Sequence, residues 1–396
     1  MPKVTLITPC FNAEKHLQQT LESIQAQTMG DYEHICVDDG STDGTPRMLE
    51  AYAERDPRVR VLRGANAGAG AARNRALEQA TGTWVYCIDA DDIMEPTLLE
   101  EAIARGEEEK AQVVIFRCDL LDSQTGQVTP FDYCFDTSWL DPKAHSFNPV
   151  AHPDRILNSF QNWVHNKLFL REFLQDNSIA FSNIHRTEEL MFTGRALTEA
   201  TRIAVLDRSL HQYRTNNLES SIENSDSYYL DFLTAFTVFR RHLEESGLWD
   251  LYGESYVNWA IEAVGGNLLR SKRKETFWNI VRAMRDGGLE RLGIVGYPAE
   301  RAYNRRQWEV CNALLNCTDD ELPLVLMHAL VRENEIVAAA TSVEAKRYRE
   351  ARDKVYELED QIAVLWQYNE DMRNSISFKL GRVLTSPLRL VHRRKE

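Results

Sequence analysis

The first 120 residues alternate between short hydrophobic runs and longer segments whose apolar residues recur every three or four positions. The short runs are rich in residues that favour β-strands, and each ends in a turn with Gly, Pro, Asn or Asp. The longer segments have the spacing of amphipathic helices, as in Leu17, Leu21 and Ile24. We predict five strands separated by helices, at residues 3–8, 32–37, 59–62, 84–88 and 112–117, with a helix at residues 96–109 before the last.

Local residues predict where two of these helices begin. Asn12 and Thr45 can each cap a helix, because short polar side chains accept hydrogen bonds from the free N–H groups of a first turn. Pro46 suits a first turn, since it has no N–H to satisfy. Strands and helices alternating at this spacing indicate an α/β fold, a parallel sheet covered on both faces.

Polar residues follow the predicted strands. Pro9 and Asn12 come after the first strand, Asp38 and Asp39 after the second, and Arg73 is on the helix after the third. Ligands of such sheets bind outside the carboxyl ends of the strands. We therefore expect these residues to line one crevice with the acidic residues that follow the fourth strand.

Those acidic residues are Asp89, Asp91 and Asp92, three carboxylates within four positions. Close negative charges repel, so a fold that holds them at a buried strand end needs a positive charge there. Mg²⁺ and Mn²⁺ prefer oxygen ligands and are commonly bound by carboxylates together with substrate phosphates. The cluster predicts a divalent cation and a phosphate-bearing substrate, and a solvated acidic turn is the alternative.

Beyond residue 120 the alternation weakens. We expect a hairpin at residues 122–134, and from residue 228 onward hydrophobic residues recur at helical spacing. Four tryptophans are expected in the core of this helical part, at Trp249, Trp259, Trp278 and Trp308. The pattern predicts an α/β domain at residues 1–225 and an all-α domain at residues 226–340.

Two further patterns end the chain. Apolar residues of segment 341–377 step by three and four, as in a coiled coil, with Asn369 at a position where a buried Asn fixes register. We predict a long helix that joins copies of the chain into a homo-oligomer; the alternative is a helix packed on its own domain. Residues 378–396 interleave apolar and basic side chains, which favours adsorption to an anionic membrane surface over a solubilising tail.

Composition narrows the class of protein. The net charge of −14 argues against a nucleic-acid-binding body. No hydrophobic run has the length of a membrane-spanning helix, and no secretory signal pattern is present. Seven cysteines without a Cys-x-x-Cys motif are expected to be reduced packing residues. These features predict a cytoplasmic protein, held by its basic tail at the inner face of the plasma membrane.

Four motifs resemble those of the family 2 glycosyltransferases, in the family's order and spacing. They are residues 8–12, 37–45, 66–68 with 72–74, and 88–92, and residues 375–382 resemble tails of bacterial surface-polysaccharide transferases. The resemblance implies a GT-A fold, a Rossmann-like mixed sheet with helices on both faces. It also implies inverting, metal-dependent sugar transfer with Mn²⁺ or Mg²⁺ as cofactor.

The resemblance assigns roles to residues of these motifs. It implies a nucleotide-sugar pocket lined by Pro9, Asn12, Asp39, Arg73, Asp89 and Arg214. Within it, Asp39 would accept a hydrogen bond from the uracil N3–H, a donor that cytosine lacks. Asp91 would bind the metal, with Asp89 and His211 as further ligands.

Family members carry a Glu-Asp pair later in the chain, whose Asp is the catalytic base. This sequence has Glu188 and Glu189 at the matching place, so we predict Glu189 as the base and Glu188 as the alternative. The longer Glu side chain moves the carboxylate by about one methylene relative to Asp. Arg214 would neutralise the diphosphate of the donor.

The resemblance predicts transfer of a hexose or N-acetylhexosamine from a UDP-linked donor to a hydroxyl of a cell-surface glycan, teichoic acid or lipid-linked acceptor. A non-catalytic sugar-nucleotide-binding or scaffold protein is the alternative, favoured by Glu at position 189. A dinucleotide-binding oxidoreductase, suggested by Gly68 and Gly70, is disfavoured. Its fingerprint should follow the first strand and contain a third glycine.

Overall fold

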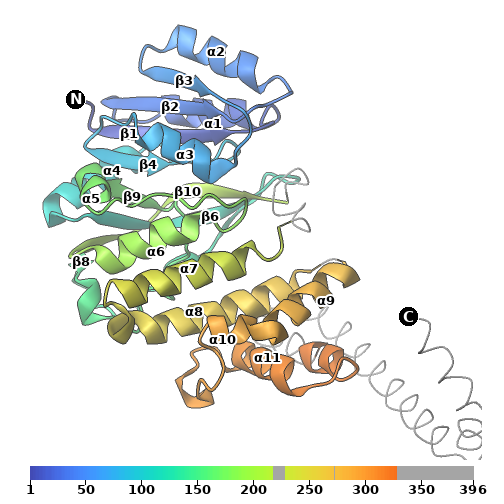
Figure 1. Cartoon of the computed structure of the whole chain (residues 1–396). Helices are drawn as coiled ribbons and strands as arrows, with labels where there is room; N and C mark the ends of the chain where they lie inside the picture. The colour runs from blue at the N-terminus through green and yellow to red at the C-terminus, as the bar shows by residue number, and fades with distance from the viewer. Residues whose placement is uncertain (217–227, 272, 328–396) are drawn as a thin grey trace, which may run out of the picture. The chain divides into compact units, whose positions relative to one another are not determined.

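The structure is a computed structural model that describes residues 1–216, 228–271 and 273–327 (Figure 1). The chain divides into two compact units, Met1–Asn316 and Cys317–Glu396, and only residues 317–327 of the second unit are described. The predicted coiled coil at residues 341–377, with Asn369, and the basic tail at residues 378–396 lie outside the described residues. The fold below is that of the first unit.

A mixed sheet runs through the first unit, with the strand order β3-β2-β1-β4-β9-β6-β10-β5. Two short strands, β7 and β8, pair with β6 and β10 outside this row. The strands are β1 (Val4–Cys10), β2 (Tyr32–Asp38), β3 (Val59–Arg63), β4 (Trp84–Cys87), β5 (Ile93–Met94), β6 (Val113–Asp122), β7 (Val128–Pro130), β8 (Ser146–Phe147), β9 (Lys167–Leu170) and β10 (Ile203–Thr215).

The sheet is parallel in its first half and mixed in its second. β1 pairs in parallel with β2 and β4, and β2 with β3, as the alternating pattern predicts. β9 then lies between β4 and β6 and is antiparallel to both. The expectation of a wholly parallel sheet is therefore wrong at this junction, whereas the mixed GT-A sheet is confirmed. The chain connects β6 to β9 through a hairpin and a long loop. Because this connection is not a helical crossover, β9 can pair antiparallel with its neighbours.

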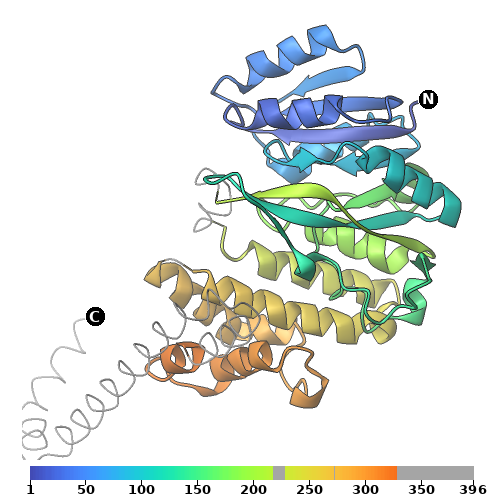
Figure 2. The same cartoon turned by 180° about the vertical axis from the view of Figure 1, so that it is seen from behind.

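Helices cover both faces of the sheet, as predicted. α3 and α6 lie in front of the sheet in Figure 1, and α1 and α4 lie in front of it when seen from behind (Figure 2). The helices of this α/β region are α1 (Leu17–Gln25), α2 (Thr45–Arg55), α3 (Ala69–Leu77), α4 (Leu98–Glu109), α5 (Arg171–Asp176) and α6 (Glu189–Glu199).

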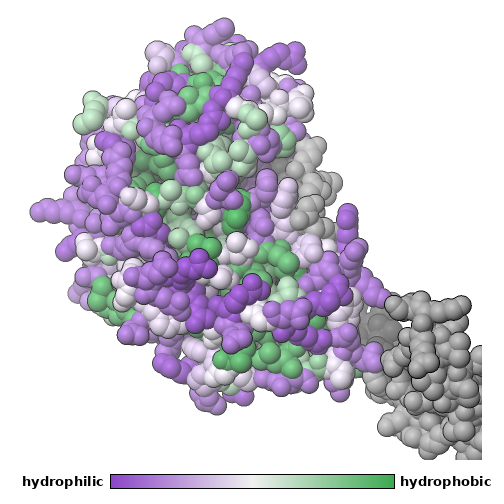
Figure 3. All heavy atoms as spheres, viewed as in Figure 1, coloured by the Kyte–Doolittle hydropathy of each residue, from purple (hydrophilic) through white to green (hydrophobic). Residues whose placement is uncertain are grey.

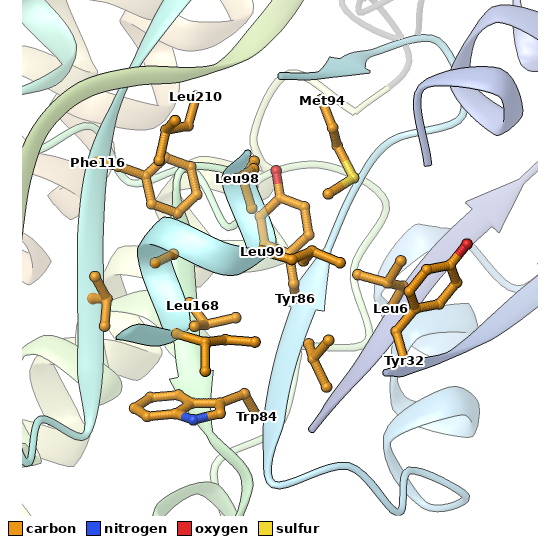
Figure 4. Close-up of a cluster of buried hydrophobic side chains, with 14 of the residues drawn as sticks. Leu6, Tyr32, Trp84, Tyr86, Met94, Leu98, Leu99, Phe116, Leu168 and Leu210 are labelled. Atoms are coloured by element: carbon orange, nitrogen blue, oxygen red, sulfur yellow. The ribbon is translucent and has the colours of Figure 1, made fainter. Parts of the chain in front are cut away.

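A hydrophobic cluster fixes α4 to the sheet (Figure 4). Leu6, Tyr86, Phe116 and Leu168 come from four different strands and pack with Leu98 of α4, and all five are fully buried. Burying one such side chain stabilises the fold by about 1.5–3 kcal/mol. The cluster therefore fixes β4, which the acidic residues follow, and β10, which contains His211.

Asn12 and Thr45 do not cap helices as predicted. α1 begins at Leu17 after His16, and Asn12 instead has a φ of 48° and accepts a hydrogen bond from the backbone N–H of Thr42 at 2.8 Å. α2 begins at Thr45 itself, whose hydroxyl accepts a hydrogen bond from Ala13 N at 2.8 Å. Both side chains join the loop after β1 to the loop after β2, a long-range contact that the local pattern does not contain.

The expected hairpin and helical region are both present in the described residues. β6 and β7 form the hairpin, closed by a hydrogen bond from Gly126 N to Asp122 O at 2.9 Å. The four tryptophans are half-buried instead of fully buried, with Trp249 and Trp259 against Tyr256 and Phe236. The helices are α7 (Asp231–Glu245), α8 (Trp249–Leu269), α9 (Lys274–Ala283), α10 (Leu289–Arg291) and α11 (Arg305–Asn316).

α7 packs against both α6 and α8, so the helical region continues the fold of the first unit. The predicted boundary near residue 225 falls in residues 217–227, outside the described part. On the face shown in Figure 3, hydrophilic residues cover most of the surface and hydrophobic residues form separate small areas, one of them over α10 and α11. Within the described ranges, no helix combines the length and apolarity needed to cross a bilayer.

Candidate active site

Arg73 of α3 is the centre of the candidate site. Its side chain is 2% exposed, and it binds Asp89 Oδ1 at 2.6 Å and Glu188 Oε1 at 2.8 Å, with Glu189 Oε1 at 3.5 Å. Burial alone would lower the pKa of Arg73, but the three carboxylates raise it well above its usual range. Through these three carboxylates Arg73 joins α3, the end of β4 and the start of α6. Its predicted role in the nucleotide-sugar pocket stays a prediction.

Glu189, the predicted base, is the first residue of α6. Its Oε2 accepts a hydrogen bond from Val164 N at 2.9 Å, and its side chain is 16% exposed. Burial raises the pKa of Glu189 to about 8, with Arg73 opposing the rise and Glu188 adding to it. A carboxylate with a pKa near neutrality can both take up and release a proton, which is the property of a general base.

Glu188 lies against the start of α3 because Gly70 leaves room for it. A Cβ added at Gly70 would lie 2.6 Å from Ser182 O and 3.0 Å from Glu188 Cγ. Glu188 O also accepts a hydrogen bond from Ser182 N at 3.1 Å. Gly70 therefore allows the start of α3 to approach the segment before α6 closely. This packing role accounts for the glycine that had suggested a dinucleotide-binding fingerprint.

Asp39 joins the loops after β2 and β3. Its side chain accepts hydrogen bonds from Ala67 N at 3.0 Å and Gly68 N at 2.8 Å, while its own N–H donates to Cys10 O at 2.8 Å. The residue is 3% exposed. A carboxylate has about four lone-pair sites, so these two bonds leave capacity for a further donor, such as the predicted uracil N–H. Pro9 lies next to this loop, half-buried at the end of β1.

The second group of site residues connects the acidic cluster to β10. Asp92 is fully buried, accepts a hydrogen bond from Arg214 N at 2.8 Å and lies 2.9 Å from His211 Nε2. Arg214 also donates through Nε to Asp91 O at 2.5 Å. Asp92 does not cap the next helix, since α4 begins at Leu98; it fastens the turn after β4 to β10.

Asp92 and His211 form a buried hydrogen bond. Tyr86 donates its hydroxyl hydrogen to His165 O at 2.7 Å, so its oxygen accepts from His211 Nδ1–H at 2.8 Å. Burial lowers the pKa of His211 to about 4, and burial together with Asp89 raises the pKa of Asp92 well above its usual range. These two pKa directions favour a neutral His211 whose bare Nε2 accepts a hydrogen bond from the Asp92 carboxyl.

His165 was not predicted as a site residue, yet it lies between the two groups. Its Nδ1 is 4.0 Å from oxygens of both Asp89 and Asp92, and neither ring nitrogen has a partner in the described chain. Lys167 fixes this turn by donating to Gln161 O at 2.5 Å and Trp163 O at 2.7 Å. A histidine in an irregular loop carries no sequence pattern that would reveal such a position.

Asp92, His165 and His211 bring three potential metal-ligand atoms within 4.8 Å of one another. The two imidazole rings are stacked, with centroids 4.5 Å apart and planes 17° apart. In this structure both nitrogens of His211 have protein partners, Tyr86 at Nδ1 and Asp92 at Nε2. The predicted metal role of His211 stays a prediction.

Asp89 and Asp91 are the other candidate ligands for a hard divalent cation. They supply carboxylate oxygens separated by one residue, and the side chain of Asp89 is 30% exposed. Asp89 retains its Oδ2 for a metal because Arg73 binds its Oδ1. Their predicted role as ligands of the metal implied by the family stays a prediction.

The mixed sheet, the acidic Asp-x-Asp turn and the buried carboxylate of raised pKa agree with the GT-A class that the sequence motifs resemble. Residues 5–176 match the family model described as Glycosyl transferase family 2. The chain is also 30% identical over 253 residues to the uncharacterized glycosyltransferase YibD of Escherichia coli K12, covering 61% of this chain and 70% of that protein. The chain belongs to glycosyltransferase family 2.

Other relatives match over a smaller share of their own length. The poly(ribitol-phosphate) beta-N-acetylglucosaminyltransferase TarS of Staphylococcus aureus is 28% identical over 255 residues, 62% of this chain and 42% of TarS. The crystal structure of TarS 1–349 in complex with UDP superposes with a TM-score of 0.59 at 22% identity, covering 82% of this chain and 90% of that one. At this identity the superposition confirms the fold.

Proposed function

We propose that this glycosyltransferase transfers a sugar with inversion from a UDP-linked donor to a hydroxyl of a cell-surface glycan, teichoic acid or lipid-linked acceptor. The observation that carries the proposal is the Arg73 centre, which holds Asp89 and Glu189 in one ion-pair group. The UDP complex of TarS and the acceptor in its name support the choice of donor and acceptor classes.

Glu189 acts as the general base in this proposal. Val164 N holds Oε2, which leaves Oε1 to take the proton of the acceptor hydroxyl. The hydroxyl oxygen then attacks the anomeric carbon from the side opposite the diphosphate, so one displacement inverts the configuration. Glu188 is held by Arg73 at 2.8 Å, closer than the 3.5 Å to Glu189, and so is less free to accept a proton.

Asp89 and Asp91 would hold Mn²⁺ or Mg²⁺, whose charge would stabilise the nucleoside diphosphate as it leaves. Arg214 lies beside this turn through its bond to Asp91 O and is the protein's own cation at that position. Asp39 binds the uracil of the donor. Arg214 donates to Asp92 through its N–H and to Asp91 O through Nε, so β10 holds the turn that carries Asp91.

The test is metal-dependent UDP release from a panel of UDP-sugars, with thermal stabilisation as the binding readout. Glu189→Gln should lose turnover by about 10²–10⁴-fold, the usual contribution of a general base, while it still binds the donor. Glu189→Asp, which restores the residue that family members carry, should keep measurable turnover. Wild-type rates in Glu189→Gln would exclude this residue as the base.

Asp91→Asn tests the metal assignment separately. Since an amide is a weaker ligand than a carboxylate for a hard cation, the variant should lose Mn²⁺-dependent stabilisation by UDP and most of its turnover. Stabilisation by UDP without metal should remain, which shows that the variant folds. If Mn²⁺ stabilises Asp91→Asn as well as the wild type, another residue binds the ion. A complete absence of UDP release in the wild type with every sugar and acceptor would favour the scaffold alternative.

A further inference from the structure

The hydroxyl of Tyr213 has no role in the mechanism proposed above. Tyr213 lies on β10 between His211 and Arg214, and its side chain is half-buried. Its hydroxyl has no hydrogen-bond partner in the described parts of the chain, and the oxygen is not shut off from solvent. Because a phenol can both donate and accept a hydrogen bond, this group is available to a ligand that enters the site.

Tyr213 lies near the carboxylates of both halves of the candidate site. Burial raises the pKa of its hydroxyl, and four carboxylates raise it further, those of Asp92, Asp89, Asp91 and Glu189. A phenol is protonated at neutral pH even without such a shift, so the hydroxyl is a neutral donor. It is therefore within electrostatic reach of the acidic turn and of the proposed base at once.

Three stacked rings lead from Tyr213 toward the surface, and we call Phe131, Trp163 and Tyr213 the aromatic wall. The ring centroids of Trp163 and Tyr213 are 4.7 Å apart, and those of Phe131 and Trp163 are 5.4 Å apart. All three residues are half-buried, and Tyr133, whose ring is 6.2 Å from that of Phe131, is 75% exposed. The aromatic wall therefore has ring surface open to solvent.

The aromatic wall lies beside the proposed base. Trp163 directly precedes Val164, whose N–H donates to Glu189 Oε2 at 2.9 Å. Lys167 Nζ fixes the same turn by donating to Trp163 O at 2.7 Å. A ligand packed on the aromatic wall can therefore present a hydroxyl to Glu189.

The charges around the aromatic wall disfavour an anionic ligand. The four carboxylates lie near one end, and Asp132, whose side chain is 87% exposed, follows Phe131 at the other. Two neighbouring cations already have partners, since Arg117 binds Asp207 and Lys167 donates three hydrogen bonds within its own turn. A phosphate would meet these negative charges, whereas the C–H face of a pyranose packs on aromatic rings and its hydroxyls can bind a phenol.

We propose that the aromatic wall binds the sugar unit of the acceptor, and that this unit is an uncharged pyranose. Its C–H face packs on Phe131 and Trp163, and one of its hydroxyls binds the hydroxyl of Tyr213. The inference rests on the proposed function and narrows its acceptor to a glycan or a lipid-linked sugar. The polyol phosphate chain of a teichoic acid has neither a ring face for the aromatic wall nor a neutral charge.

The experiment titrates the full chain with methyl glycosides of glucose, galactose and N-acetylglucosamine and with ribitol phosphate, and follows binding by saturation-transfer NMR. At least one glycoside should bind, and ribitol phosphate should bind more weakly. Tyr213→Phe keeps the ring but removes the hydroxyl, so it should bind that glycoside about three- to tenfold more weakly, the usual contribution of one neutral hydrogen bond. Tyr297→Phe is the matched control, since Tyr297 is a half-buried tyrosine of the helical region.

Phe131→Leu should also weaken glycoside binding, because leucine keeps an apolar side chain but loses the flat ring. Equal affinities of Tyr213→Phe and Tyr297→Phe, wild-type affinity in Phe131→Leu, or no glycoside binding by the wild type would each overturn the proposal. So would ribitol phosphate binding as tightly as the best glycoside. No nucleotide, metal or turnover enters this measurement, so its outcome is independent of UDP release in Glu189→Gln, which tests the proposed function.

Discussion

Arg73 carries one positive charge and faces three carboxylates in an almost solvent-free position. An excess of two negative charges in such a place is costly, so the group favours uptake of a proton or of a cation. Burial is the main cause of the raised pKa of Glu189, and the neighbouring carboxylates add to it. In the proposed function, a divalent ion at Asp89 would be the second response, so the same charge imbalance would favour both the base and the metal.

The pH dependence of the rate follows from Glu189. Its carboxyl must be deprotonated to accept the hydroxyl proton, and its pKa is raised to about 8 chiefly by burial. We therefore expect kcat/KM to rise as pH increases and to level off above the pKa of Glu189, instead of being flat from pH 5 upward as with an ordinary glutamate. A rate profile at saturating metal checks this, and a flat profile between pH 6 and 9 would contradict it.

Loss of the Arg73 charge should destabilise the whole site. Arg73→Met leaves Asp89, Glu188 and Glu189 without their common partner, and breaking a buried ion pair in this way costs about 3–5 kcal/mol. Arg73→Lys keeps the charge but loses the two-armed geometry, so it should lie between the wild type and Arg73→Met. Urea denaturation measures both. Equal stability of Arg73→Met and the wild type would show that the ion pairs do not stabilise the fold.

At the scale of elements, the alternation of hydrophobic runs and amphipathic segments predicts β1 to β4 and α1 to α4. The prediction succeeds there because each of these elements forms from the pattern of its own residues. β9 and the turn before it depend on distant partners: Lys167 donates to carbonyl groups of its own loop, and Val164 N reaches Glu189. The carboxylates at 89, 188 and 189 were predicted from motifs. The sequence contains no local signal for His165 or for the stacking of its ring on His211.

Gly70 is the element-scale feature that keeps α3 close to the segment before α6. Gly70→Ala would place a Cβ 2.6 Å from Ser182 O, so the two segments must separate. We expect a loss of about 1–3 kcal/mol in stability and a lower kcat, because Glu188 and Arg73 would move apart. Gly30→Ala is the control, since its Cβ would be 3.7 Å from Arg58 Nη1, an ordinary contact. Equal kcat in both variants would contradict this role for Gly70.

At the scale of the whole molecule, the family resemblance extends over the α/β part, and the helices from α7 onward continue the same compact unit. The prediction of membrane adsorption concerns residues 378–396 and stays a prediction. A chain ending at residue 377 should sediment less with vesicles of anionic lipid than the full chain, and salt should weaken sedimentation of the full chain. Neutral vesicles provide the comparison. Equal sedimentation of both chains would exclude the tail as the anchor.

The position of β9 also has a consequence for synthesis. β4 and β6 emerge from the ribosome well before β9, which begins at residue 167. In the finished sheet β9 lies between them, so β4 and β6 do not pair with each other. During that interval each exposes a free hydrophobic edge, the kind of edge from which strands join between molecules. A nascent chain stalled between residues 122 and 166 should therefore depend on chaperones, and release from that dependence should coincide with emergence of β9.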